Sequence, residues 1–388
     1  MKVESRAFFL TMRIFTSIIF SLICTMVFAQ ADGFYRVKNH KTQRYITVVD
    51  KKGSVNLSTS DADLGALVTI KGFDRVVSDV SSVIHIKKVP SAGGYNFETQ
   101  GVDTYGIIGY YVKLRNGTVS GTYRAYAQHG SMVKYLCDEN WDGDEGWLNT
   151  SSAQTQNWYI LPVSSEGDNY FGVTPSINLG AATYYHAFYA AFPFELASAG
   201  MTAYYVDFVD GGLAVWKEVA NGVVPAAAPV ILKMKSDKAS NNRLDFLEST
   251  PTKLSGNVLK GVYFNNDGEL TNGGHINQTK YDPATMRVLG KMKDGSLGFI
   301  TDKTLDYLPA NSAYLKVGKG SPEEIKLVTE EEYEVLAGVD DIFVDKKPLV
   351  QGIYSICGVK LSDDVSSLNT LPAGIYIVDG KKVVVGKK

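Results

Sequence analysis

The stretch Phe34-Tyr35-Arg36-Val37 has two counterparts farther along the chain, Val83-Ile84-His85-Ile86 and Tyr123-Arg124-Ala125-Tyr126. Each is an apolar strand followed by a polar turn and a second strand that contains an aromatic residue at or near its start. These second strands are Arg44–Thr47, Gly94–Phe97 and Lys134–Leu136. The spacing of roughly 40–50 residues is typical of structural repeats. Because three such repeats can close on themselves and leave few free sheet edges, the pattern predicts a pseudo-threefold, all-β module.

The third repeat ends in Gln156-Asn157-Trp158, a Gln-x-Trp motif. Together with the Tyr-Arg-Val opening, it resembles the ricin-type β-trefoil lectin family over residues 32–165. The resemblance implies a structural role for Gln156 and Trp158, with the tryptophan in the trefoil core. The first two repeats reach Leu64–Val68 and Gly106–Tyr110 without this motif, a departure from the family that argues against sugar sites in these two repeats.

A second strand-rich module is predicted over residues 170–318. Asp210-Gly211 and Asp294-Gly295 each lie between apolar runs. This is a strong hairpin signal, because both residue types tolerate positive φ. The sequence therefore predicts an antiparallel β-sandwich that is interrupted by a long polar loop from Lys235 to Lys253.

The composition changes beyond Gly318. Thr329 precedes Glu332 by three residues, which is a capping-box pattern and predicts a short helix within a charged linker over 319–347. Residues 348–388 then read as a short C-terminal β-hairpin segment. Its Gly374–Val378 stretch, followed by Asp-Gly-Lys-Lys, resembles the C-terminal tails of exported Bacteroidetes surface proteins, including short relatives of the type IX secretion sorting domain. That resemblance implies display outside the cell.

Residues 1–29 are typical of a signal peptide: Lys2, Arg6 and Arg13 supply positive charge, and the apolar run Ile14–Ala29 ends in small residues. We expect an exported protein that is secreted, attached to the cell surface or outer membrane, or periplasmic, with no transmembrane segment after cleavage. The formal net charge of −2 argues against nucleic acid as a partner, because phosphates require a basic surface.

The best candidate for a ligand site is the loop that begins at Asp138 in the third repeat. Asp138 and Asn140 offer hydrogen-bonding groups for sugar hydroxyls, and Trp141 or Trp147 offers a ring on which a sugar can stack. The alternative is that one tryptophan packs beneath the loop and the other has no role.

The same loop also matches the first half of a calcium-binding loop. Asp138, Asn140 and Asp142 alternate as oxygen ligands, and Gly143 permits a sharp turn. Asn149 occupies the twelfth position, where a bidentate glutamate is expected, so a solvated acidic turn is the alternative. No other cofactor is predicted.

The known catalytic motifs are not found, including the Gly-x-Ser-x-Gly elbow, His-Glu-x-x-His and a phosphate-binding loop. We expect a non-catalytic exported protein whose trefoil binds a glycan or another surface polymer. One alternative is a structural or adhesive envelope protein whose degenerate trefoil contacts other proteins; another is an enzyme whose catalytic residues meet only in three dimensions. Cys137 and Cys357 either form a disulfide or remain two buried thiols.

Overall fold

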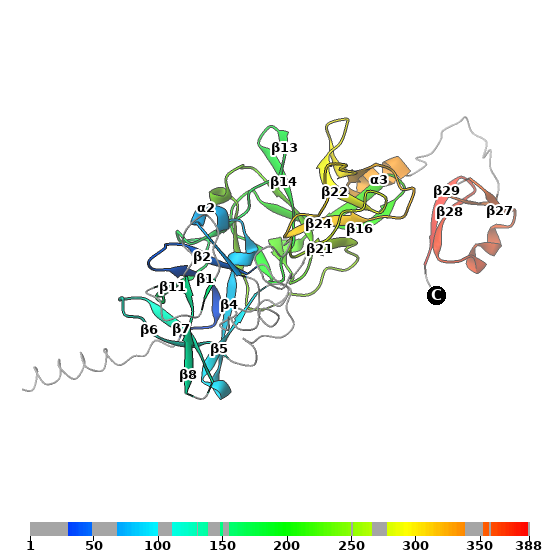
Figure 1. Cartoon of the computed structure of the whole chain (residues 1–388). Helices are drawn as coiled ribbons and strands as arrows, with labels where there is room; N and C mark the ends of the chain where they lie inside the picture. The colour runs from blue at the N-terminus through cyan, green and yellow to red at the C-terminus, as the bar shows by residue number, and fades with distance from the viewer. Residues whose placement is uncertain are drawn as a thin grey trace, which may run out of the picture.

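The structure is a computed structural model that describes residues 30–48, 68–99, 111–129, 131–138, 148–149, 155–249, 251–265, 278–337, 352–356 and 358–386. Its regular structure is mostly strand, which confirms the all-β class (Figure 1). The described helices are short: α2 (Phe73–Val76), α3 (Glu330–Ala337) and the 3-10 helices η1 (Val80–Ser82), η2 (Pro90–Ala92), η3 (Ala220–Gly222), η4 (Ala239–Asn241) and η5 (Val365–Thr370).

Six strands of the N-terminal part form a closed antiparallel ring. They are β1 (Gly33–Asn39), β4 (Ile84–Val89), β5 (Gly94–Glu98), β6 (Lys113–Asn116), β7 (Tyr123–His129) and β11 (Trp158–Pro162). Pairing runs from β1 to β4 and β5, across a bridge between Tyr95 and Val112, then through β6, β7 and β11 back to β1. The remaining strands of this part pair as hairpins beside the ring: β2 (Tyr45–Val48) with β3 (Val68–Lys71), β8 (Met132–Tyr135) with β7, and β9 (Cys137–Asp138) with β10 (Leu148–Asn149).

Alternate strands of the ring carry the same short pattern. In β1, β5 and β7, a tyrosine is followed two residues later by a buried apolar side chain; the pairs are Tyr35 and Val37, Tyr95 and Phe97, and Tyr123 and Ala125. The second repeat therefore begins at β5, not at Val83–Ile86 as the sequence predicts. Most of Val83–Ile86 belongs to β4, which pairs with β1 and with β5. This strand therefore completes the first repeat.

The second part of the chain contains two sheets. A four-stranded sheet has the order β12 (Phe171–Gly172), β20 (Arg243–Phe246), β15 (Phe194–Leu196) and β18 (Val223–Val224). A ten-stranded sheet has the order β13 (Ile177–Gly180), β14 (Thr183–Phe188), β19 (Val230–Met234), β16 (Thr202–Asp210), β17 (Leu213–Glu218), β25 (Glu324–Val328), β23 (Leu297–Ile300), β22 (Met286–Lys291), β24 (Ser312–Lys316) and β21 (Leu259–Val262).

The strand β19 shows how these layers pack. Val230 and Leu232 point into one core, which they share with Phe171 and Phe194 of the four-stranded sheet. Ile231 points into a second core on the opposite face, formed within the ten-stranded sheet. A strand that is buried on both faces needs a continuous apolar run, which is what Val230–Leu232 provides.

Both predicted Asp-Gly hairpins are present: β16 pairs with β17, and β22 pairs with β23. Two other parts of this region differ from the prediction. The predicted polar loop over 235–253 contains η4 and the strand β20, whose Leu244 is buried. The predicted charged linker contains β25, which joins the ten-stranded sheet beside β17 and β23. In β25, buried Ile325 and Leu327 alternate with charged residues. Because the strand is short, its sequence looks like part of a charged linker.

The predicted capping box at the start of α3 is confirmed. The Thr329 N–H donates to Glu332 Oε2 over 2.9 Å, and the Glu332 N–H donates to Thr329 Oγ1 over 3.1 Å. These reciprocal bonds satisfy two backbone donors at the helix start. Within the described part of the chain, no helix is long and apolar enough to span a membrane.

The C-terminal residues form a separate four-stranded sheet in the order β27 (Lys360–Ser362), β26 (Ile353–Ser355), β28 (Gly374–Val378) and β29 (Lys381–Val385). Asp379 and Gly380 connect β28 to β29, with φ values of 49° and 79°. Positive φ at both turn residues matches the right-handed twist of the two strands, which explains the Asp-Gly sequence at this position.

The closed ring and the second part of the chain share one hydrophobic core. Phe34 of β1 belongs to the same cluster as Phe171 and Phe194. Its ring stacks on His85 with centroids 4.4 Å apart, and it meets the rings of Phe192 and Phe246 at 5.1 and 5.5 Å. The two parts are therefore packed as one body at this contact.

Two buried polar groups reinforce the same contact. The two ring nitrogens of His85 lie 3.1 Å from Glu98 Oε2 and 2.9 Å from Glu248 Oε2, which links the ring of strands to the second part. Arg36 is fully buried, and its guanidinium donates to the backbone carbonyls of Val76 and Tyr170 over 3.0 and 2.8 Å. Further bonds reach Ser82, Val77 and Asn169. Burial lowers the pKa of Arg36 to about 10.

Candidate functional site

Asp138, the first residue of the predicted ligand loop, lies in β9 and is fully buried. Its carboxylate accepts hydrogen bonds from Arg44 Nη2 over 2.7 Å, Arg44 Nε over 3.2 Å and Thr42 Oγ1 over 2.5 Å. These contacts join the third repeat to the hairpin that follows β1. These contacts and the burial of the carboxylate favour a structural role for Asp138, and its role as a sugar or calcium ligand remains a prediction.

The other residues of the predicted loop site are Asn140, Trp141, Asp142 and Trp147, and all four lie outside the described residues. Their proposed roles in sugar or calcium binding remain predictions. Among the residues that the structure does describe, no group of three or more histidine, cysteine or acidic side chains is arranged to hold a metal ion.

The Gln-x-Trp motif lies at the base of the third repeat. Trp158 is 1% exposed within the core of the ring, and its indole N–H donates to the Leu136 carbonyl over 2.9 Å. Gln156 is buried, and its Oε1 accepts a hydrogen bond from Arg124 Nη2. Cys137 is buried nearby with its Sγ 3.3 Å from the Tyr135 carbonyl, whereas Cys357 lies outside the described residues.

Sequence reasoning did not find the outward face of β6, β7 and β8. Here Arg115 and Arg124 lie directly opposite each other, as do Tyr126 and Tyr135. The guanidinium carbons of Arg115 and Arg124 lie 4.4 and 4.8 Å from the centroid of the Tyr135 ring. Arg115 also lies 5.6 Å from the centroid of Tyr126. We call these four residues, together with Lys113, the arginine–tyrosine face.

Strand geometry explains why these side chains gather on one side. Leu114 and Ala125 pack against the core of the ring, so their neighbours in sequence point outward. Arg115 is exposed, and Arg124, Tyr126 and Tyr135 are half-buried. In the sequence, the arginine–tyrosine face is indicated by long polar or aromatic residues that alternate with smaller apolar ones. It can be recognised only once β6 is known to pair with β7.

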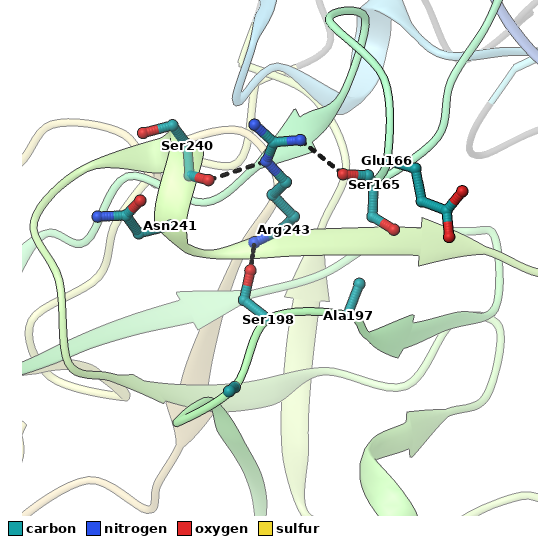
Figure 2. Close-up of a pocket in the computed structure, with 8 residues that line it drawn as sticks. Ser165, Glu166, Ala197, Ser198, Ser240, Asn241 and Arg243 are labelled. Atoms are coloured by element: carbon teal, nitrogen blue, oxygen red, sulfur yellow. Dashed lines mark hydrogen bonds between the residues drawn. The ribbon is translucent and has the colours of Figure 1, made fainter.

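An open pocket of about 520 Å³ lies in the second part of the chain. Figure 2 shows Arg243 at its centre: its Nε donates to the Ser240 carbonyl over 2.8 Å, and its Nη1 donates to the Ser165 carbonyl over 2.6 Å. Its guanidinium also lies 4.0 Å from the centroid of the Tyr170 ring. Arg243 therefore joins β20 to the segment that leaves β11. The lining contains a single carboxylate, that of Glu166, and no histidine or cysteine.

Comparison with known proteins gives little further information. No family model matches the chain, and no curated protein matches it either. Among solved structures, one similar chain is described as "Structure and mode of action of a mosquitocidal holotoxin". It is 11% identical, the match covers 74% of this chain and 40% of that chain, and the TM-score is 0.28. The chain thus spans less than half of that chain's length, and this likeness carries no argument about function.

Proposed function

We propose that this chain is a non-catalytic, exported binding protein whose N-terminal module is a β-trefoil that binds carbohydrate. The arginine–tyrosine face is the observation that carries the proposal. Tyr126 provides a ring surface on which a sugar can stack, and the neighbouring arginines provide hydrogen-bond donors for hydroxyl groups. The Tyr135 ring, whose centroid lies 5.7 Å from that of Tyr126, holds both arginines in place beside it.

Three structural facts support the trefoil. Six strands close into a ring, the pattern of a tyrosine and a buried apolar residue recurs in every second strand of that ring, and Trp158 lies in its core. The proposal of export rests on the sequence of residues 1–29 and of the C-terminal segment.

The test is binding of the purified mature chain to a broad glycan array, with and without calcium. We expect binding that is lost in Tyr135→Ala and retained in Tyr307→Ala. Tyr307 is a suitable control because it is 41% exposed and lies in the second part of the chain. Trp141→Ala and Trp147→Ala test the predicted loop in the same assay. Absence of binding by a well-folded protein would refute the carbohydrate proposal.

A structural or adhesive envelope protein is the second candidate, and one observation favours it. Exposed apolar side chains are concentrated in the C-terminal segment, where Val359, in the turn between β26 and β27, is 60% exposed and Val384, on β29, is 69% exposed. Ile356, Leu361 and Val365 are also exposed. Apolar residues gathered on a surface are typical of protein contacts. Retention of the chain on envelope preparations that have been stripped of glycans would support this alternative.

A further inference from the structure

The arginine–tyrosine face concentrates positive charge. Lys113 and Arg115 on β6 and Arg124 on β7 project from the same side, and β6, β7 and β8 contain no acidic residue. The whole chain has a formal net charge of −2, so this is a local feature and not a property of the composition.

Arg115 and Arg124 are direct cross-strand partners. Like charges in that position destabilise a strand pair, so their placement has a cost that a neighbouring carboxylate would normally offset. In the part of the chain that the structure describes, neither guanidinium forms an ion pair with a carboxylate. They lie over the ring of Tyr135, a contact worth about 0.5–1 kcal/mol at exposed sites.

The hydrogen-bonding groups of this pair are also incompletely used. Arg124 donates from Nη2 to Gln156, and its Nε is buried without a hydrogen-bond partner among the described residues, so an anion would reach this side chain through the outer part of its guanidinium. Arg115 is exposed, and its guanidinium carbon lies over the rings of Tyr126 and Tyr135. Among the described residues, the two side chains are thus held in place by aromatic rings and, for Arg124, by Gln156, and not by carboxylates.

We propose that this face selects negatively charged glycans, meaning chains that carry carboxylate or sulfate groups, with Arg115 and Arg124 as the anion-binding pair. A guanidinium binds planar or tetrahedral oxyanions through paired N–H donors, and an anion between the two arginines relieves their repulsion. Tyr126 lies beside the pair and offers its ring to the sugar that bears the anion. This inference rests on the proposed carbohydrate-binding function and names the class of glycan.

The experiment uses the mature chain and three polymers with one backbone: dextran, carboxymethyl-dextran and dextran sulfate. Titration calorimetry should detect binding of one or both charged polymers. We expect Arg115→Gln to weaken that binding at least tenfold, which is the effect of losing a charge-assisted hydrogen bond. Lys260→Gln, which removes a charge from an exposed position on β21, should leave the affinity unchanged. Comparison of the two charged polymers identifies the preferred anion.

A second variant guards against effects on folding. Arg115→Lys keeps the charge but loses the planar pair of donors, so it should bind the preferred polymer more weakly than the wild-type chain and more tightly than Arg115→Gln. If Lys260→Gln and Arg115→Gln lose the same amount of affinity for the charged dextrans, the attraction is non-specific and the inference is overturned. Binding of neutral array glycans without preference for the charged dextrans would overturn it as well, while sparing the proposed function. Failure to bind any glycan would refute both.

Discussion

Replacement of Asp138 by alanine decides between a structural and a ligand-binding role for this carboxylate. In the structure, Asp138 is fully buried and accepts two hydrogen bonds from Arg44, whose side chain is 11% exposed. The Asp138→Ala variant removes the carboxylate that this enclosed guanidinium contacts, and it removes the acceptor of the Thr42 hydroxyl. Breaking one side of a buried ion pair costs about 3–5 kcal/mol, so we expect a loss of that order in the free energy of unfolding.

Urea unfolding followed by tryptophan fluorescence measures this loss, because Trp141, Trp147 and Trp158, three of the four tryptophans, lie in the third repeat. Asp138→Asn should cost less, because the amide still accepts a hydrogen bond. The double variant Arg44→Met, Asp138→Leu should recover part of the loss by removing both charges. A loss below about 0.5 kcal/mol for Asp138→Ala, together with abolished glycan binding, would refute the structural role and restore Asp138 as a ligand.

Three further predictions concern other parts of the chain. Burial lowers the pKa of His186 from 6.5 to about 4, so the unfolded chain binds more protons between these values. As the pH drops from 6.5 to about 4, the free energy of unfolding should therefore fall by at most about 3 kcal/mol. When this free energy is measured by urea unfolding at several pH values, the His186→Gln variant should show a smaller fall over the same range. Arg36→Met removes the guanidinium hydrogen bonds to the carbonyls of Val76, Val77 and Tyr170, and the Tyr170 carbonyl loses the donor described above. It should lower the free energy of unfolding in urea by about 3 kcal/mol, and unchanged stability would contradict the network described. Thr329→Ala removes the capping box and should destabilise α3 by about 1 kcal/mol, visible as faster amide exchange in that helix than in the wild-type chain.

The all-β class and the individual hairpins follow from local patterns. Asp210-Gly211 and Asp294-Gly295 mark their turns because the signal lies within a few residues of the strands that it joins. The capping box at Thr329 is local in the same way. The strand β25 was missed, because its buried Ile325 and Leu327 alternate with charged residues over only five positions.

Features that depend on distant partners were not predictable in this way. The stretch Val83–Ile86 resembles the opening of a repeat, and only its pairing with β1 shows that it closes one. Asp138 has the chemistry of a ligand until Arg44, 94 positions away, is placed beside it. The arginine–tyrosine face likewise exists only after β6, β7 and β8 are aligned in register.

The shared core around Phe34 has a consequence for the order of folding. Phe34 is the second residue of the first strand of the ring, but it packs on Phe192 and Phe246. A chain made from its N-terminus at about 5–20 residues per second leaves this aromatic side chain without its final partners for roughly 10–40 s. Throughout that interval the first module presents an apolar surface. We therefore expect the N-terminal module, when produced alone, to depend on a chaperone or a solubilising partner that the full-length chain does not need.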